Sequence, residues 1–126
     1  MYKKMEEMVP GKRKWIIADG FLPEKSNGDF VSHEAVCVLN LSEKTAEIEM
    51  KVYFEDREPM MGFQAECKPQ RTNHIRLDKI KNINGEKIPV GIPYAVQVIS
   101  SQPIIAQHSR MDTSQKELSL MTTVAY

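Results

Sequence analysis

Apolar and polar residues alternate most regularly between positions 46 and 54 of this chain. One face would carry the apolar residues and the other the charged ones: Ile48, Met50, Val52 and Phe54 against Glu47, Glu49 and Lys51. A period of two is typical of a half-buried β-strand, because successive side chains in a strand point to opposite faces. We therefore predict a strand here, with one face in the core.

Further segments have the composition of short strands and are separated by turn-forming residues. They cover residues 15–19, 31–40, 62–67, 71–78, 94–101, 104–111 and 118–126. Breaks fall at Gly20, Asn27-Gly28, Pro59, Asn84-Gly85 and Gln102-Pro103. Residues 114–121 also allow a short helix. About eight strands, with breaks every 8 to 12 residues, predict an all-β fold: an antiparallel, jelly-roll-like β-sandwich.

The N-terminal segment differs from the rest of the chain. Residues 1–12 are polar and rich in methionine, and they include the breaker Pro10-Gly11. We expect them to form an arm, either a short helix or a loose segment. Residues 13–126 are expected to form a single β-sandwich domain, which is long enough to bury a hydrophobic core.

Acidic and basic residues are balanced in number. Lys and Arg together number 17, as do Asp and Glu, so the formal net charge is zero. Nucleic-acid binders need positive charge to neutralise phosphates, so the composition argues against nucleic acid as a partner. The run Lys12-Arg13-Lys14 is shorter than a typical basic patch and indicates a solvated lead-in to the first strand.

The two cysteines, Cys37 and Cys67, lack Cys-x-x-Cys spacing, and no signal peptide precedes them. Reduced thiols are the default in the cytoplasm, so we expect a cytoplasmic localisation. No apolar run approaches the roughly 18 residues that a spanning helix needs. A role at a membrane would therefore require a partner.

The most distinctive chemistry lies in two segments with the same pair of residues, His74-x-Arg76 and His108-x-Arg110. Residues i and i+2 of a strand share a face and lie roughly 6.6 to 7 Å apart, so each pair would point its imidazole and guanidinium the same way. Both pairs have apolar neighbours, among which a charge is costly unless it is paired with an opposite charge or binds a ligand. Such donors suit a carboxylate, a phosphate or a sugar-like polyol.

Glu34 and Asp112 are the candidate counter-charges for these pairs. Glu34 would balance them if its strand face meets theirs, and Asp112 follows Arg110 on the same face. We expect one polar pocket to contain the following residues: Glu34, His74, Arg76, His108 and Arg110. The alternative is that they form structural ion pairs or, for His74 and Arg76, the exposed face of an outer strand.

Trp15, the only tryptophan, either packs in the core or offers an aromatic platform to a sugar ring. The three histidines and Glu34 could in principle bind a metal, but no spacing pre-positions two ligands, and the arginines would repel a cation. No Gly-x-Ser-x-Gly elbow is present, and Cys37 lies in an apolar strand where thiols are inert. We predict no metal, no cofactor and no catalytic residue.

Several blocks of sequence resemble the sensory rhodopsin transducer family. They are Trp15-Ile-Ile-Ala-Asp19-Gly20-Phe21-Leu22-Pro23, Ser26-Asn27-Gly28, Ser32-His33-Glu34-Ala35-Val36-Cys37-Val38-Leu39-Asn40, Val52-Tyr53-Phe54, Asp56-Arg57-Glu58-Pro59, Arg71-Thr72-Asn73-His74-Ile75-Arg76, Gln107-His108-Ser109-Arg110-Met111-Asp112 and Thr123-Val124-Ala125-Tyr126. The resemblance covers about residues 13–126 in order. Asp19 stands where the family leads us to expect a glutamate, a change that keeps the carboxylate.

The resemblance implies a soluble, cytoplasmic, all-β sandwich that assembles as a homotetramer. It also implies a role downstream of a photoreceptor in members that are paired with one. A small-molecule, sugar-related binding role is a further implication of the family.

Three functions follow as hypotheses. The leading one is a non-enzymatic module that binds an oxygen-rich small molecule, sugar-like or anionic, through Glu34, the two His-x-Arg pairs, Trp15 and Asp112. The alternative is a transducer that docks on a membrane receptor or a regulator without a small ligand, its polar clusters being structural. A metal-dependent enzyme is the third and weakest reading.

Overall fold

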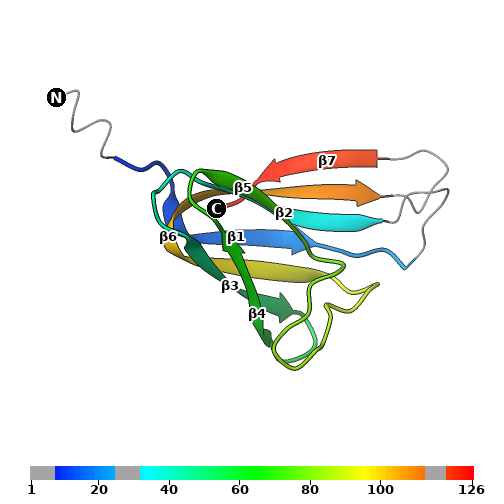
Figure 1. The fold of residues 1–126 in the computed structure, drawn as a ribbon. Coiled ribbons are helices and arrows are strands. Elements are labelled where there is room, and N and C mark those ends of the chain that lie inside the picture. The colour runs from blue at the N-terminus through cyan, green and yellow to red at the C-terminus, as the bar shows by residue number, and fades with distance from the viewer. Residues whose placement is uncertain (1–7, 25–31, 113–118) are drawn as a thin grey trace.

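A computed structural model describes residues 8–24, 32–112 and 119–126 of the chain, and the strands within them are antiparallel (Figure 1). In chain order they are β1 Lys12–Gly20, β2 His33–Asn40, β3 Ala46–Phe54, β4 Met60–Cys67, β5 Arg71–Arg76, β6 Tyr94–Asp112 and β7 Ser119–Val124. No helix occurs among the described residues. The predicted all-β antiparallel sandwich is confirmed.

The long strand β6 belongs to both layers of the sandwich. Its first part lies between β3 and β1, and its second part lies between β2 and β7. One layer therefore reads β4-β3-β6-β1 and the other β5-β2-β6-β7. The strand curves strongly between these two parts, which turns the sheet back on itself (Figure 1).

The prediction of separate strands over residues 94–101 and 104–111 was wrong, because β6 runs through Gln102-Pro103 without a break. Pairing with β3 ends at Ser100, and pairing with β2 begins at Ile105. Pro103 lies between these two ladders, where its missing N–H interrupts neither of them. Pro103 therefore lies at the change of layer and does not end the strand.

The alternation predicted at residues 46–54 is realised in the core. Ile48, Met50 and Val52 are each at most 2 % exposed, and they pack with Val96 and Val98 of the adjacent part of β6. Burial of each such side chain contributes about 1.5 to 3 kcal/mol. The two layers are held together mainly by this shared apolar core.

The N-terminal and C-terminal predictions are tested only in part. Residues 1–7 of the predicted arm lie outside the described residues, and residues 8–10 have no regular secondary structure. The helix considered for residues 114–121 is replaced from Ser119 onward by β7, while residues 113–118 lie outside the described part.

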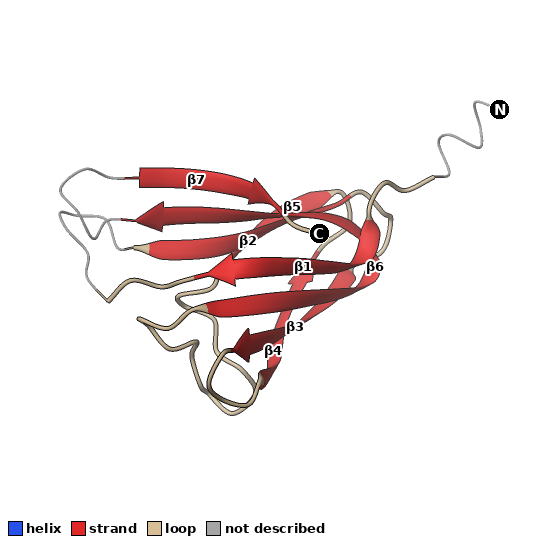
Figure 2. Ribbon diagram, turned by 180° about the vertical axis from the view of Figure 1, so that it is seen from behind, coloured by secondary structure: helices blue, strands red, loops and turns tan. Residues whose placement is uncertain are grey.

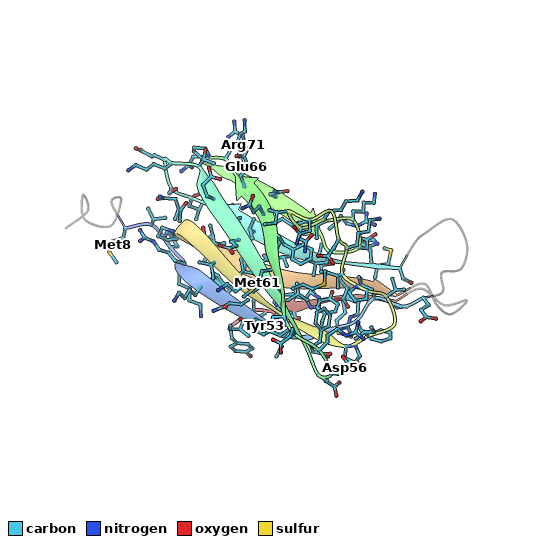
Figure 3. The ribbon with its side chains drawn as sticks, turned by 90° about the horizontal axis from the view of Figure 1, so that it is seen from below. Met8, Tyr53, Asp56, Met61, Glu66 and Arg71 are labelled. Atoms are coloured by element: carbon cyan, nitrogen blue, oxygen red, sulfur yellow. The ribbon has the colours of Figure 1, made fainter. Side chains whose placement is uncertain are left out.

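The charged loop that follows β3 lies at one end of the molecule. Asp56 is near its tip, whereas Glu66 and Arg71 lie at the opposite end, close to the turn that joins β4 to β5 (Figure 3). Asp56 and Arg57 pair with each other in this loop at 3.0 Å and are solvent-exposed.

Candidate functional site

The carboxylate of Glu34, fully buried at 0 % exposure, is the centre of a polar cluster. Arg110 Nε donates to Oε2 at 2.6 Å, and His108 Nε2 lies 3.1 Å from Oε1. The Tyr94 hydroxyl donates to Oε1 in a short hydrogen bond. The backbone amide of Phe21 lies 3.0 Å from Oε2 and 3.2 Å from Oε1. Each oxygen of the carboxylate is therefore contacted by at least two hydrogen-bonding groups.

Strand register explains how these residues meet. Glu34 lies directly opposite Arg110 in the β2–β6 ladder, and its neighbour on the same face, Val36, lies opposite His108. Paired residues of an antiparallel ladder point to the same side, so all three polar side chains enter the interior. Tyr94 reaches the cluster from the other layer, at the start of β6. The cluster therefore bridges the two layers.

The hydrogen bonds keep Glu34 ionised. Burial alone would raise the pKa of this carboxyl, but hydrogen bonds from His108, Tyr94 and the Phe21 amide outweigh it, and the pKa lies below its ordinary value. Burial, together with the negative charge of Glu34, raises the pKa of Tyr94 far above that of a free tyrosine. Tyr94 is therefore a neutral donor to a carboxylate anion.

A cleft opens beside this cluster, between β1 and β7. Ile16 of β1 and Tyr126, which lies beyond the end of β7, exchange backbone hydrogen bonds, and Figure 2 shows the C-terminus between the two strands. The cleft has a volume of about 250 Å³. Its lining combines mostly apolar walls with a few polar groups: Ile16, Ile17, Ala18, Asp19, His108, Arg110, Met121, Thr123, Val124 and Tyr126.

Arg110 connects the buried cluster to this cleft. Its Nε is used by Glu34, while Nη2 donates to the backbone oxygen of Asp19 at 3.3 Å and lies 3.9 Å from the Asp19 carboxylate. The Arg110 side chain is 29 % exposed and that of Asp19 is 89 % exposed. No described side chain bonds Nη1. Within the described part of the chain, the outer edge of the guanidinium therefore has a nitrogen without a hydrogen bond, and Arg110 lines the cleft.

His74 and Arg76 do not join the site, which corrects the prediction that both His-x-Arg pairs share one pocket. In the β2–β5 ladder Ile75 lies opposite Val36 on the inner face, so its two neighbours point outward. Arg76 forms an ion pair with Asp78 at 2.7 Å, and His74 is exposed. The two pairs lie on opposite faces of one layer. His108 and Arg110 lie opposite the inward-facing residues of β2, whereas His74 and Arg76 lie opposite its outward-facing residues.

The remaining candidates are placed elsewhere. Trp15 is 9 % exposed and packs in the core, where its indole N–H lies 2.9 Å from the Lys12 carbonyl and 3.0 Å from that of Ile104. The side chain of Asp112 lies outside the described residues. No group of His, Cys, Asp or Glu side chains suited to a metal ion occurs within residues 8–24, 32–112 and 119–126.

The sequence reading missed Tyr94, Thr123 and the Phe21 amide. Tyr94 follows Pro93 at the start of β6, and only its alternation with Val96 and Val98 could have placed it on the inner face. A backbone amide carries no sequence signal. Asp19 was noted only as a substitution within a family block.

The chain is similar to one known protein family and to solved structures. The profile described as "Anabaena sensory rhodopsin transducer" (ASRT) matches residues 10–126. The chain belongs to this family. This confirms the resemblance found in the sequence.

Solved structures that share the fold of this ASRT-family chain include the following two. "Crystal Structure of Thermotoga maritima 1070" is 37 % identical, with a TM-score of 0.82, and the match covers 92 % of this chain and 94 % of that one. The Anabaena sensory rhodopsin transducer is 33 % identical, with a TM-score of 0.74, over 83 % of this chain and 92 % of that one. No curated protein sequence matches the chain. Among the described residues of this ASRT-family chain, no helix is long and apolar enough to cross a membrane.

Proposed function

We propose that this chain is a non-enzymatic signalling module that binds a small molecule with carboxylate, phosphate or sugar oxygens in the β1–β7 cleft. The observation that carries the proposal is the position of Arg110. Arg110 donates from Nε to the buried Glu34, and the other edge of its guanidinium lies at an open cleft. Small-molecule sites typically have apolar walls and a few polar groups that fix the ligand's orientation.

A binding role agrees with the chemistry of the cluster better than a catalytic one. Glu34 is enclosed and held by Arg110, His108 and Tyr94, so its carboxylate cannot reach a substrate in the cleft. The same enclosure fixes the guanidinium in one orientation. A rigid donor loses little conformational entropy on binding, which favours recognition.

A thermal-shift screen with sugars, sugar acids and inorganic phosphate tests the proposal. A ligand at 100 times its dissociation constant should add about 2.7 kcal/mol to the free energy of unfolding. Thr123 and Thr122 form a matched pair, because both are exposed neighbours on β7 but only Thr123 lines the cleft. Thr123→Phe should abolish the stabilisation, and Thr122→Phe should retain it. Stabilisation that survives Thr123→Phe would place the ligand elsewhere.

A transducer that docks on a membrane photoreceptor or a regulator is the second candidate. The name of the Anabaena neighbour connects that protein with a sensory rhodopsin. Along β7 and the C-terminus, Met121, Val124 and Tyr126 are 54 %, 63 % and 79 % exposed. Exposed apolar side chains on an edge strand favour contact with another chain. For this role we propose a cytoplasmic homotetramer.

Light scattering and cross-linking to membranes that contain a candidate receptor test this second role. A species of only 14.4 kDa at micromolar concentration would contradict the tetramer. Tyr126→Ser should weaken the receptor contact if the β7 edge makes it. Receptor binding that is equally strong in this variant would exclude the edge as the docking surface.

A further inference from the structure

We propose that the β1–β7 cleft binds a small α-amino acid with an apolar side chain, such as leucine. This inference rests on the proposed ligand-binding function and narrows it to one chemical class. It follows from three features of the cleft: a guanidinium edge, the neighbouring Asp19 carboxylate, and apolar walls.

The guanidinium edge of Arg110 suits the carboxylate of the ligand. Its Nη2 is held by Asp19 at 3.3 Å, and no described side chain bonds Nη1. Arginine presents parallel N–H groups that match the two oxygens of a carboxylate. Because Glu34 holds the guanidinium through Nε, the outer edge is already oriented before a ligand arrives.

The acceptor beside this edge, the Asp19 carboxylate, suits an ammonium group. The Asp19 carboxylate lies 3.9 Å from Arg110 Nη2 and is 89 % exposed at the rim of the cleft. A donor and an acceptor separated by this distance can bind the adjacent carboxylate and ammonium groups of one α-amino acid. A simple anion would instead lie beside the like charge of Asp19 with no ammonium group to offset it, and a phosphate would be repelled more strongly.

His108 also lines the cleft, and its imidazole is fixed there by the contact of Nε2 with the Glu34 carboxylate at 3.1 Å. The ionised Glu34 can only accept hydrogen bonds, so His108 Nε2 carries the proton of this contact.

The walls and the volume suit a short apolar side chain. Ile17, Ala18, Met121 and Val124 offer no hydrogen-bonding side chain. A polyol would lose water on several hydroxyls against these walls without replacing its hydrogen bonds, which is costly. A volume of about 250 Å³ leaves room for a small ligand of this kind.

Isothermal titration calorimetry with four probes tests the inference. The probes are L-leucine, 4-methylpentanoate (which lacks the ammonium group), isopentylamine (which lacks the carboxylate) and gluconate (a polyol acid). L-leucine should bind at least tenfold more tightly than each of the others. Thr123→Phe should abolish leucine binding, and Thr122→Phe should preserve it.

Asp19→Asn separates the role of the ammonium group from that of the cleft as a whole. This exposed side chain makes no buried contact, so the variant should fold normally. It should weaken L-leucine binding at least tenfold and leave 4-methylpentanoate binding equal or stronger. The matched control Asp56→Asn, in the loop at the end of β3, should change neither (Figure 3).

The outcomes distinguish the inference from the function on which it rests. Gluconate binding that depends on Thr123, with no leucine binding, would overturn the amino-acid inference and retain the proposed function. Absence of binding by these probes and by the sugars, sugar acids and phosphate of the thermal-shift screen would overturn both. Leucine binding that is unchanged in Thr123→Phe or in Asp19→Asn would also overturn the inference.

Discussion

Arg110 donates from Nε to the Glu34 carboxylate at 2.6 Å, although the two residues lie 76 positions apart in the chain. Glu34 is fully buried, whereas the guanidinium is 29 % exposed and reaches the cleft. The pair therefore has two roles in one contact. It joins β2 to the second part of β6, and it orients the guanidinium edge beside the proposed ligand.

Replacement of the buried carboxylate should destabilise the fold. Glu34→Gln removes the charge and turns an amide N–H₂ toward groups that are themselves donors. Breaking a buried pair costs about 3 to 5 kcal/mol, and we expect about 3 because Arg110 can still reach water. Urea unfolding measures the change. Glu49→Gln, on the exposed face of β3, should leave the unfolding midpoint unchanged. An equally stable Glu34→Gln would refute a structural role for the cluster.

Loss of the Tyr94 hydroxyl should have a smaller effect. Tyr94→Phe keeps the ring in the core but removes one donor from Glu34. A hydrogen bond to a charged group contributes about 1.5 to 3 kcal/mol, and we expect a loss in this range. The control is Tyr53→Phe, whose exposed hydroxyl lies 3.2 Å from Gln97 and whose loss should cost less than about 0.5 kcal/mol. Equal effects of the two variants would contradict the prediction.

Stability should fall at both ends of the pH scale. The pKa of Glu34 is lowered in the folded state from its ordinary 4.5. Below pH 4.5 the unfolded chain thus binds more protons at this site than the folded chain does, and stability is lost as the pH falls through the folded pKa. The pKa of Tyr94 is raised from 10.0, so above pH 10 the unfolded chain releases a proton that the folded chain keeps, and stability again falls.

Denaturant unfolding between pH 3 and pH 11 checks both arms. Glu34→Gln should flatten the acid arm, because the group that titrates has gone. Tyr94→Phe should flatten the alkaline arm for the same reason. If either variant keeps the full slope of the wild-type protein, the loss of stability comes from other groups.

Gly20 should be needed to seat the Tyr94 ring. A Cβ at Gly20 would lie 2.4 Å from Tyr94 Cε2, so Gly20→Ala must displace the ring, at a cost of about 1 to 3 kcal/mol. Combined with Tyr94→Phe, it should show non-additive effects, because displacement of the ring already breaks the hydroxyl contact with Glu34 that Tyr94→Phe removes. Gly85→Ala, with no atom within 4 Å but a φ of +78°, should lose stability independently of Tyr94. Additive effects of the two changes would show that Gly20→Ala leaves the contact of the Tyr94 hydroxyl with Glu34 intact.

Strand positions and same-face pairs were determined by local sequence. The strand Ala46–Phe54 was predicted with its bounds, because alternation of apolar residues acts over neighbouring positions. His108 and Arg110 share a face for the same reason. The family blocks were also recognised from the sequence, and the match over residues 10–126 confirms them.

Register and strand order were decided only by the tertiary structure. His74-x-Arg76 and His108-x-Arg110 are alike as sequences, yet Ile75 takes the inner position in β5 and the histidine takes it in β6. The shift of a ladder by one residue exchanges the two faces, and the local pattern around each pair is too short to determine which face is buried. The donors to Glu34 come from residues 21 to 110, and the cleft forms where β1 and β7 separate. The polar cluster around Glu34 and the cleft both depend on contacts between distant segments. Such contacts are established only when the whole sheet closes around its core.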